Sequence, residues 1–234
     1  YGDWEKFRSK NVIMYTIIKR IMDIMFSVIS LILFLPLFIP IILLLLFSAE
    51  GEVLYFQDRL GYKNKPFQIW KFATMLKNSL QMGSGTITLK NDFRVTKIGS
   101  FLRKTKINEL PQIINILKGD ISFVGPRPLV SSSFEAYPKN IQAQIYNVKP
   151  GLTGIGSIIF RDEESLISSI SDEDPHAYYN RVIAPYKGGL ELWYQQNSSF
   201  TTDFKILFIT AYVVVFPSNL LVYKVFKDLP TRKF

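Results

Sequence analysis

The segment KINELPQ, residues 106–112, places a carboxylate at what its residue types predict to be the start of a helix. Asn108 is a good N-cap residue for the run ELPQIINILK, and Pro111 is tolerated in a first helical turn. A helix start presents free N–H groups and the positive end of the helix dipole, where phosphate or carboxylate is favoured. Glu109 could therefore hold a metal ion that bridges phosphates, or it could complement the dipole without doing any chemistry.

Several predicted elements surround this segment and must position it. Residues 53–57 and 67–72 are rich in β-forming side chains and flank a turn-rich stretch, which predicts a small hairpin. Residues 94–104 carry apolar side chains at helical spacing, Phe101 among them, and are expected to form a helix with basic residues opposite. The helix that follows Asn108 is expected to end at Gly119.

Composition indicates a membrane or phosphate ligand rather than nucleic acid. The chain has 234 residues, which fits one domain with a sizeable core, and 48% of them are hydrophobic. It has no Cys, which excludes disulfides, thiolate metal sites and a thiolate nucleophile. The net charge of +9 favours nucleic acid, anionic lipid or phosphorylated substrates. Nucleic acid is not expected as a partner, because no recognisable binding motif is present and a hydrophobic run adjoins the basic residues.

That hydrophobic run, residues 24–47, carries no charge. A straight helix of this length would measure about 36 Å, enough to cross a bilayer core. Pro36 and Pro40 fall near its middle, where each removes a backbone donor and crowds a carbonyl. Basic residues flank the run on both sides, so the positive-inside rule gives no orientation. A crossing helix and a re-entrant helix that bends at the prolines both remain open.

The C-terminal part repeats this pattern more weakly. Residues 204–216 are apolar apart from Lys205 and are short for a membrane span, which suits either an interfacial helix or a core helix. Pro217 ends the run, and a basic, aromatic tail suited to a head-group surface follows. At the other end the chain begins at Tyr1, so an N-terminal leader could precede it.

The stretch LRKTKINELPQIINILKGDISFVGPRPLV, residues 102–130, strongly resembles the signature of the bacterial monotopic phosphoglycosyl transferases, the bacterial sugar transferase family. The resemblance continues from Lys19 to Ile206 through further motifs that occur in the expected order. These are KRIMDI (19–24), FQDRLGYKNKPFQIWKFATM (56–75), VKPGLTGIG (148–156), FRDE (160–163) and SSFTTDFKI (198–206).

The resemblance implies a mainly α fold with a small β-hairpin (α+β) in a monotopic membrane protein. A re-entrant helix-break-helix, with its break at Pro36 and Pro40, would enter only the cytoplasmic leaflet, and amphipathic helices would lie at the interface. Four parts are then expected: a basic amphipathic lead-in (1–20), the re-entrant membrane helix (21–48), a globular catalytic domain (49–200), and a C-terminal interfacial helix with a basic tail (201–234).

The resemblance also implies a reaction and its partners. A phosphosugar passes from a UDP-sugar to polyprenyl phosphate, normally undecaprenyl phosphate, and UMP is released; this is the first membrane step of glycoconjugate biosynthesis. The expected cofactor is Mg²⁺, the expected location is the cytoplasmic face of the bacterial inner membrane, and a homodimer is left open. Family members use an Asp-Glu pair, in which Asp attacks the phosphate and forms a covalent intermediate.

Residue by residue, Glu109 matches the metal-binding acid of the pair. Arg103, Arg127 and Arg161 match arginines that contact substrate phosphate, and Lys71 is a further phosphate contact; arginine suits this role because its forked donors fit phosphate oxygens. Pro126 and Pro128 stiffen the loop that holds Arg127. Asp203, Glu191 and Asp120 are candidate supporting residues, and for Asp203 and Glu191 a structural and a functional role both stay open.

Two positions depart from the family pattern. The nucleophile position holds Asn108, and an amide is neutral and weakly nucleophilic. Ala73 stands where many relatives carry a basic residue. Four explanations of Asn108 stay open: another carboxylate such as Glu109 attacks; polyprenyl phosphate displaces UMP directly; the protein is a catalytically silent scaffold or substrate-binding module; or Asn108 is an engineered substitution. The retained arginines favour an active enzyme, and no residue pattern identifies the sugar.

Overall fold

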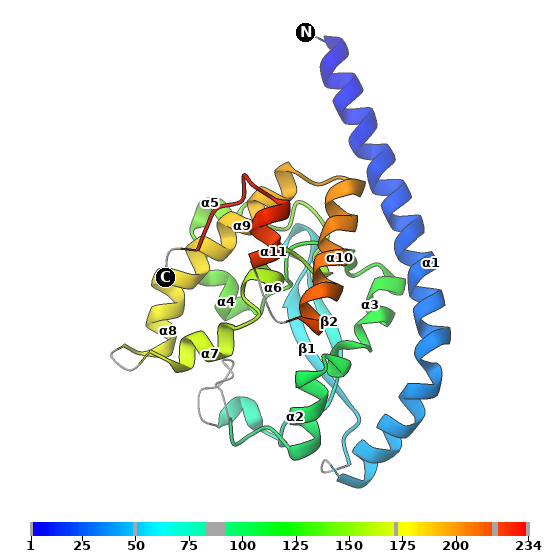
Figure 1. Cartoon of the computed structure of the whole chain (residues 1–234), viewed down its shortest axis with the longest axis vertical. Coiled ribbons are helices and arrows are strands. Elements are labelled where there is room, and N and C mark those ends of the chain that lie inside the picture. The colour runs from blue at the N-terminus through cyan, green and yellow to red at the C-terminus, as the bar shows by residue number, and fades with distance from the viewer. Residues whose placement is uncertain (1, 49–50, 83–91, 171–172, 217–219, 233–234) are drawn as a thin grey trace.

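The computed structural model describes residues 2–48, 51–82, 92–170, 173–216 and 220–232, with residues 2–11 described by their backbone alone. One long N-terminal helix, α1, runs beside a mostly helical domain that contains two small sheets (Figure 1). The helices are α1 (Gly2–Ser48), α2 (Lys97–Lys104), α3 (Gln112–Lys118), α4 (Ser131–Glu135), α5 (Lys139–Gln142), α6 (Ile155–Ile159), α7 (Glu163–Ser168), α8 (Pro175–Tyr178), α9 (Ala184–Gln196), α10 (Phe200–Val215) and α11 (Leu220–Val225). The strands are β1 (Leu54–Leu60), β2 (Pro66–Phe72), β3 (Ser122–Val124) and β4 (Gly151–Thr153). A mainly helical fold with a small hairpin is confirmed.

The hairpin and a second, parallel strand pair carry the segments around the candidate site. β1 and β2 pair antiparallel from Leu54 opposite Phe72 to Leu60 opposite Pro66, as the two β-rich runs predicted. β3 and β4 pair in parallel, which no sequence pattern predicted because each strand is only three residues long. This second pair sets the loop after β3 against the segment that follows β4.

Helix α1 does not break at its prolines, which corrects the expected helix-break-helix. It is assigned as helix continuously from Gly2 to Ser48 with Pro36 and Pro40 inside, and it curves along its length (Figure 1). Each proline removes one backbone donor and crowds the carbonyl four residues earlier, and bending relieves that crowding without ending the helix. Because the prolines are four residues apart, both defects lie on one face of α1, so the bend has one direction.

Both ends of the apolar part of α1 contact the domain. Near its start, Arg20 donates from its guanidinium to the carbonyls of Ile116 and Leu117 at the end of α3, at 2.6 and 2.8 Å. Near its end, Ile41 and Leu45 are buried against Phe72 and Leu102 in a cluster that they share with β2 and α2. Between these contacts most large apolar side chains are exposed, and only 11% of the most apolar window within residues 12–47 is buried. By length and composition alone α1 could cross a membrane.

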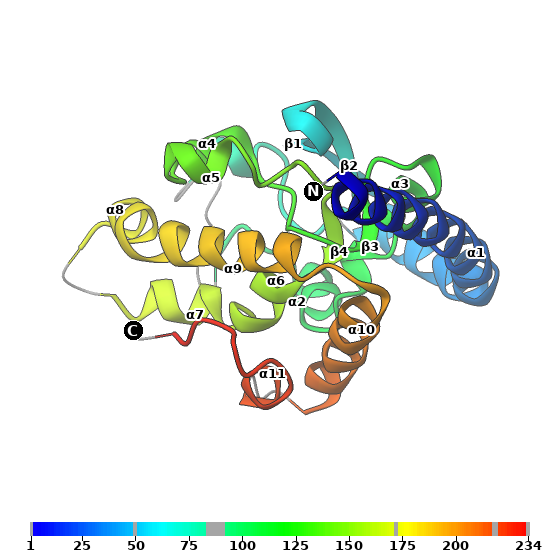
Figure 2. The same cartoon turned by 90° about the horizontal axis from the view of Figure 1, so that it is seen from above.

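The main core lies on the other side of the hairpin, around α9. Figure 2 shows α9 running across the molecule between α4 and α5 on one side and α7 and α11 on the other. Fully buried Ile155, Ile159, Ile183 and Leu190 form its centre. α10 turns Ile206, Ile209 and other apolar residues into this core, as expected for a core helix. Its opposite face leaves Phe204 and Phe208 more than half exposed, as is Phe216 just after its end, and an interfacial position stays a prediction.

Two local predictions around KINELPQ need correction. α3 begins at Gln112, and Asn108 lies before it in a 3-10 turn, Ile107–Glu109, so Asn108 is not the N-cap of α3. Pro111 lacks an N–H and holds the N-cap position itself, which moves the helix start beyond the acid. Gly119 ends α3 with a φ of 94°, as predicted. In α2, Phe101 is 60% exposed rather than part of a buried face.

Candidate active site

Three segments distant in sequence meet at the Glu109 carboxylate. Glu109 ends the 3-10 turn, Lys71 lies near the end of β2, and Arg127 lies in the loop after β3. The Glu109 Oε1 atom accepts a hydrogen bond from Arg127 Nη2 at 3.3 Å and lies 3.8 Å from Lys71 Nζ. The side chains of Lys71 and Glu109 are 16% and 14% exposed, so solvent screens this pair only weakly. Lys71, Glu109 and Arg127, predicted separately from the sequence, are therefore brought together.

The backbone turn that presents Glu109 is unusual. Lys106 adopts the left-handed conformation with a φ of 61°, which reverses the chain after α2. This conformation is uncommon for a residue with a side chain, and such positions cluster at functional sites. After this turn, Glu109 lies 3.8 Å from Lys71 of the hairpin.

Positive charge exceeds negative charge around Glu109. Burial alone would raise the pKa of Glu109, but Arg127, Lys71 and Lys106 together lower it to about 2. Burial lowers the pKa of Lys71 to about 7, although Glu109 opposes that change. Burial also lowers the pKa of Arg59 to about 10, and the neighbouring Arg127 adds to this effect. One carboxylate that stays ionised among several crowded cations leaves a surplus of positive charge, which suits an anion with several oxygens.

The loop that carries Arg127 is fixed by close backbone packing. A Cβ atom on Gly125 would lie 2.4 Å from the Lys149 carbonyl oxygen, and one on Gly151 would lie 2.1 Å from the Gly125 nitrogen. The Gly125 N–H donates to the Thr153 carbonyl at 3.0 Å, and the Gly151 N–H donates to the Pro126 carbonyl at 2.8 Å. The glycines of GPRP and VKPGLTGIG are thus required because two backbone segments are in contact. This contact fixes the main-chain position of the loop that carries Arg127.

Arg103 lies at the edge of this site. Its Nη2 atom pairs with Glu164 at 2.5 Å, and its charge acts on both Lys71 and Lys106. Arg103 is thus within electrostatic reach of the centre, although no hydrogen bond to Glu109 is recorded for it. Asn108 is 6% exposed, and its Oδ1 atom has no hydrogen-bond partner among the described residues.

The remaining predicted residues lie elsewhere or behind the site. Arg161 donates from Nη1 to the Val213 carbonyl at the end of α10, so the structure does not bring it to Glu109. Asp120 accepts from Asn115 at 2.9 Å, and Asn115 in turn bonds the β2 backbone, so Asp120 helps dock α3 on the hairpin. Glu191 is buried in α9 and accepts from the Arg127 backbone N–H at 3.4 Å.

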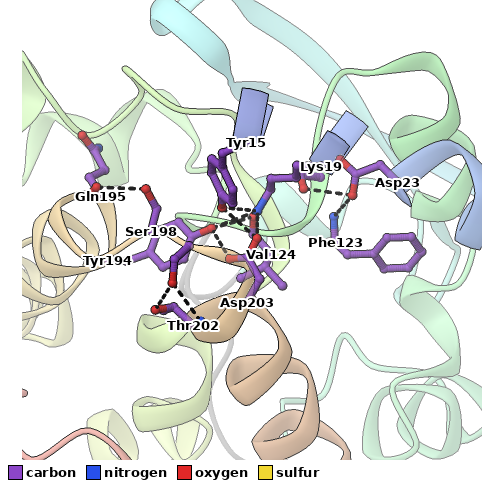
Figure 3. Close-up of polar contacts among 12 residues, drawn as sticks. Tyr15, Lys19, Asp23, Phe123, Val124, Tyr194, Gln195, Ser198, Thr202 and Asp203 are labelled. Atoms are coloured by element: carbon purple, nitrogen blue, oxygen red, sulfur yellow. Dashed lines mark hydrogen bonds and ion pairs between the residues drawn. The ribbon is translucent and has the colours of Figure 1, made fainter. Parts of the chain in front are cut away.

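Asp203 belongs to a separate polar cluster between α1 and α10. Its carboxylate pairs with Lys19 at 2.5 Å and accepts from the hydroxyls of Tyr15 and Tyr194 at 2.8 and 2.7 Å (Figure 3). Nearby on α1, Asp23 accepts from the Phe123 backbone N–H at 3.1 Å (Figure 3). These contacts fix α1 to the domain, so the geometry gives Asp203 a structural position.

A divalent metal ion would find few protein ligands at Glu109. Among the described residues no group of three or more His, Cys, Asp or Glu side chains could hold one. Glu109 supplies one carboxylate, and the adjacent Asn108 carries an unpartnered buried amide oxygen. Mg²⁺ is commonly bound through one or two carboxylates together with substrate phosphates and water. The two residues fit that mode of binding and do not fit a site built from protein ligands alone.

Two cations were missed by the sequence prediction. Arg59 in β1 acts electrostatically on both Lys71 and Glu109, and it donates to the Pro128 carbonyl at 3.2 Å. Lys106 lowers the pKa of Glu109. Both lie inside motifs that carried the family resemblance, FQDRLGYKNKPFQIWKFATM and KINELPQ. Their basic character in those motifs was the available signal.

Comparison with known proteins shows the family of the chain. The family model described as "Bacterial sugar transferase" matches residues 14–217. The chain belongs to the bacterial sugar transferase family. The matched region contains α1 from residue 14, the Lys71–Glu109–Arg127 cluster and all of α10.

Curated relatives are about a third identical to the chain over the aligned residues. One is the "UDP-glucose:undecaprenyl-phosphate glucose-1-phosphate transferase" of Klebsiella pneumoniae, 35% identical over 84% of this chain and 40% of that protein. Another is the "Undecaprenyl-phosphate galactose phosphotransferase" of Salmonella typhimurium, 34% identical over 85% of this chain and 40% of that protein. The "Exopolysaccharide production protein ExoY" of Rhizobium meliloti is 34% identical over 82% of this chain and 83% of that protein. The chain thus spans less than half the length of the first two and most of the third.

Proposed function

We propose that the chain transfers a sugar 1-phosphate from a UDP-sugar to undecaprenyl phosphate, releasing UMP and forming the lipid-linked diphosphate sugar that begins glycoconjugate assembly. The observation that carries this proposal is the Glu109 carboxylate held between Lys71 and Arg127 in a surplus of positive charge. Relatives named for transfer to undecaprenyl phosphate support the acceptor. Their names include different sugars, so the proposal specifies the class of donor and not the sugar.

The site's residues suit phosphoryl transfer because that reaction depends on positioning and on neutralising charge. Arg127 can form paired hydrogen bonds to phosphate oxygens, and Lys71 and Arg59 add positive charge beneath it. Glu109 orients Arg127 and Lys71 through a hydrogen bond to the first and an ion pair with the second. Mg²⁺, held by Glu109 and the Asn108 amide oxygen, would neutralise charge on the donor diphosphate.

Asn108 limits the possible routes. An amide cannot form the acyl phosphate that an aspartate forms, so no covalent intermediate on Asn108 is proposed. Two routes suit the residues present. In one, an oxygen of undecaprenyl phosphate attacks the donor's sugar-bearing phosphorus and UMP leaves with the bonding electron pair. In the other, the Glu109 carboxylate attacks that phosphorus and expels UMP, and an oxygen of the lipid phosphate then attacks the same phosphorus and releases the carboxylate. Intact-mass measurement after mixing the protein with donor alone separates them, because only the second route leaves a phosphosugar adduct.

We further propose that α1 enters a single leaflet of the inner membrane from its cytoplasmic face. A helix that crosses the bilayer would carry its far half away from the domain. In α1, however, Arg20 near one end of the apolar part and Leu45 near the other both contact the domain. The curvature of α1 and the exposed apolar face of α10 are consistent with an apolar surface lying along the lipid (Figure 1).

Release of UMP tests the proposed reaction. Purified protein in detergent or nanodiscs is mixed with Mg²⁺, undecaprenyl phosphate and a panel of UDP-sugars. UMP should appear with at least one donor, and more than one equivalent per protein should be released only when the lipid phosphate is present. A cooperative unfolding transition shows that the preparation is folded. If such a preparation releases no UMP with any donor, the proposal is overturned.

A further inference from the structure

The peptide groups of the Arg127 loop have an almost complete set of hydrogen-bond partners. Proline at positions 126 and 128 removes two N–H groups, so few donors remain to hold this loop in place. The groups that remain on either side of Arg127 do not bond to each other as in a regular turn. The Pro126 carbonyl accepts from the Gly151 backbone N–H, whereas the Arg127 N–H and carbonyl bond to two side chains, Glu191 and Tyr146.

The Tyr146 hydroxyl bridges the two residues that flank Pro128. It donates to the Arg127 carbonyl at 2.9 Å and accepts from the Leu129 N–H at 2.8 Å. The tyrosine is 1% exposed and stacks on Phe134, with ring centroids 5.9 Å apart and an angle of 15° between the planes. One buried hydroxyl therefore uses both its donor and its acceptor capacity on the Arg127 loop, in a ring orientation set by packing.

Glu191 acts on the opposite side of the same residue. Its Oε1 atom accepts from the Arg127 N–H, while its Oε2 atom is buried without a recorded partner in the described part of the chain. The carboxylate fits tightly against the segment after β4, because a Cβ atom on Gly156 would lie 2.3 Å from Oε1. α9 thus places one side chain at the N–H of Arg127, and the segment before β4 places another at its carbonyl.

We propose that Tyr146 and Glu191 are positioning residues that hold the main chain of Arg127 from both sides and so fix its guanidinium beside Glu109. Among the described residues, neither makes a hydrogen bond to Glu109 or Lys71, so their hydrogen bonds affect the site through the Arg127 loop. The inference rests on the proposed function, since the guanidinium is positioned for the donor phosphate. Misplacement of a catalytic group by about 1 Å can reduce a rate on the order of 100-fold.

Tyr146→Phe is the main test, with Tyr186→Phe as its matched control. Tyr186 also donates to a backbone carbonyl, that of Pro230 at 2.7 Å, but it lies away from the Arg127 loop. We expect Tyr146→Phe to lower the kcat for UMP release by roughly 10- to 100-fold with a smaller change in KM for the donor, and Tyr186→Phe to change kcat by less than about 3-fold.

A double-mutant cycle with Arg127→Lys separates positioning from a general loss of structure. If Tyr146 acts through Arg127, then Tyr146→Phe should reduce activity by less than about 3-fold when Arg127→Lys is already present. Fully additive losses would overturn the proposal. For the second residue, Glu191→Leu should behave like Tyr146→Phe. Glu191→Gln keeps an acceptor oxygen and should retain most of the activity, and equal losses in both variants would exclude the acceptor role.

Amide hydrogen exchange tests the same contacts without enzymatic activity. Tyr146→Phe should speed exchange of the Leu129 N–H at least about 10-fold, Glu191→Leu should do the same for the Arg127 N–H, and Tyr186→Phe should do neither. Unchanged exchange at both positions would overturn the inference even if the enzyme is active. A protein that releases no UMP but shows these exchange changes would refute the proposed function and leave the positioning contacts supported.

Discussion

Replacing Glu109 by Gln removes the one negative charge that lies between Lys71 and Arg127. The pKa of Glu109 lies at about 2, against an ordinary value of 4.5. At about 1.4 kcal/mol for each pH unit, its ionised form contributes about 3 kcal/mol to folding at neutral pH. The carboxylate is 14% exposed, so little of this is lost to solvent screening. A similar figure is expected when one partner of a buried ion pair is removed, about 3–5 kcal/mol.

The assay is denaturant unfolding of detergent-solubilised protein, followed by tryptophan fluorescence, from pH 7 down to pH 2. Glu109→Gln should lower the free energy of unfolding by about 3 kcal/mol at pH 7. Because folding depresses this pKa, the stabilisation is complete above about pH 4.5 and is lost as the pH falls towards 2. The difference between wild type and variant should therefore close over that interval.

The matched control is Glu52→Gln. Glu52 pairs with Lys77 at 3.4 Å on the surface, where both side chains are about half exposed. Its replacement should change the free energy of unfolding by less than about 1 kcal/mol. If Glu109→Gln is no more destabilising than Glu52→Gln at pH 7, or if its effect persists unchanged at pH 2, then the electrostatic description of the site is wrong.

Three further changes test other parts of the account. Gly151→Ala forces a Cβ atom against the Gly125 nitrogen, so it should lower the free energy of unfolding by about 1–3 kcal/mol and reduce the rate of UMP release; unfolding and activity measurements check both. Asp203→Asn breaks the pair with Lys19 and should lower the free energy of unfolding by about 3 kcal/mol; an unchanged unfolding curve would show that this pair does not anchor α1. Asn108→Asp places a carboxylate where the sequence resemblance predicts the nucleophile and should give a phosphosugar adduct by intact-mass analysis, and continued turnover without any adduct would contradict that.

Motifs predicted the members of the site better than they predicted its geometry. Lys71, Glu109 and Arg127 were identified from short sequence motifs, and the fold brings Lys71 and Arg127 within 4 Å of one carboxylate oxygen of Glu109. Arg161 and Asp203 lie in motifs just as recognisable, yet their contacts lie elsewhere. A motif indicates that a residue has a role, but it does not show whether the residue contacts substrate or holds two helices together.

Long-range contacts explain most of what the sequence could not predict. β3 and β4 are too short to show a period of two, and they exist because the glycines of two distant segments allow close backbone packing. In the sequence, nothing distinguishes Tyr146 from the other aromatic residues. Its role depends on packing against Phe134, which places its hydroxyl between the Arg127 carbonyl and the Leu129 N–H. The continuity of α1 through Pro36 and Pro40 depends on a bend that is compatible with contacts at both of its ends.

The central claim is that the cations around Glu109 bind the diphosphate of the donor. Calorimetric titration of UDP into detergent-solubilised protein with Mg²⁺ tests it most directly, with Arg127→Ala compared against Arg181→Ala, an arginine whose side chain is 65% exposed and pairs with Glu173. Arg127→Ala should weaken UDP binding at least about 10-fold, in line with the loss of a charge-assisted contact, while Arg181→Ala should leave it unchanged. Equal affinity of wild type and Arg127→Ala for UDP would contradict the account.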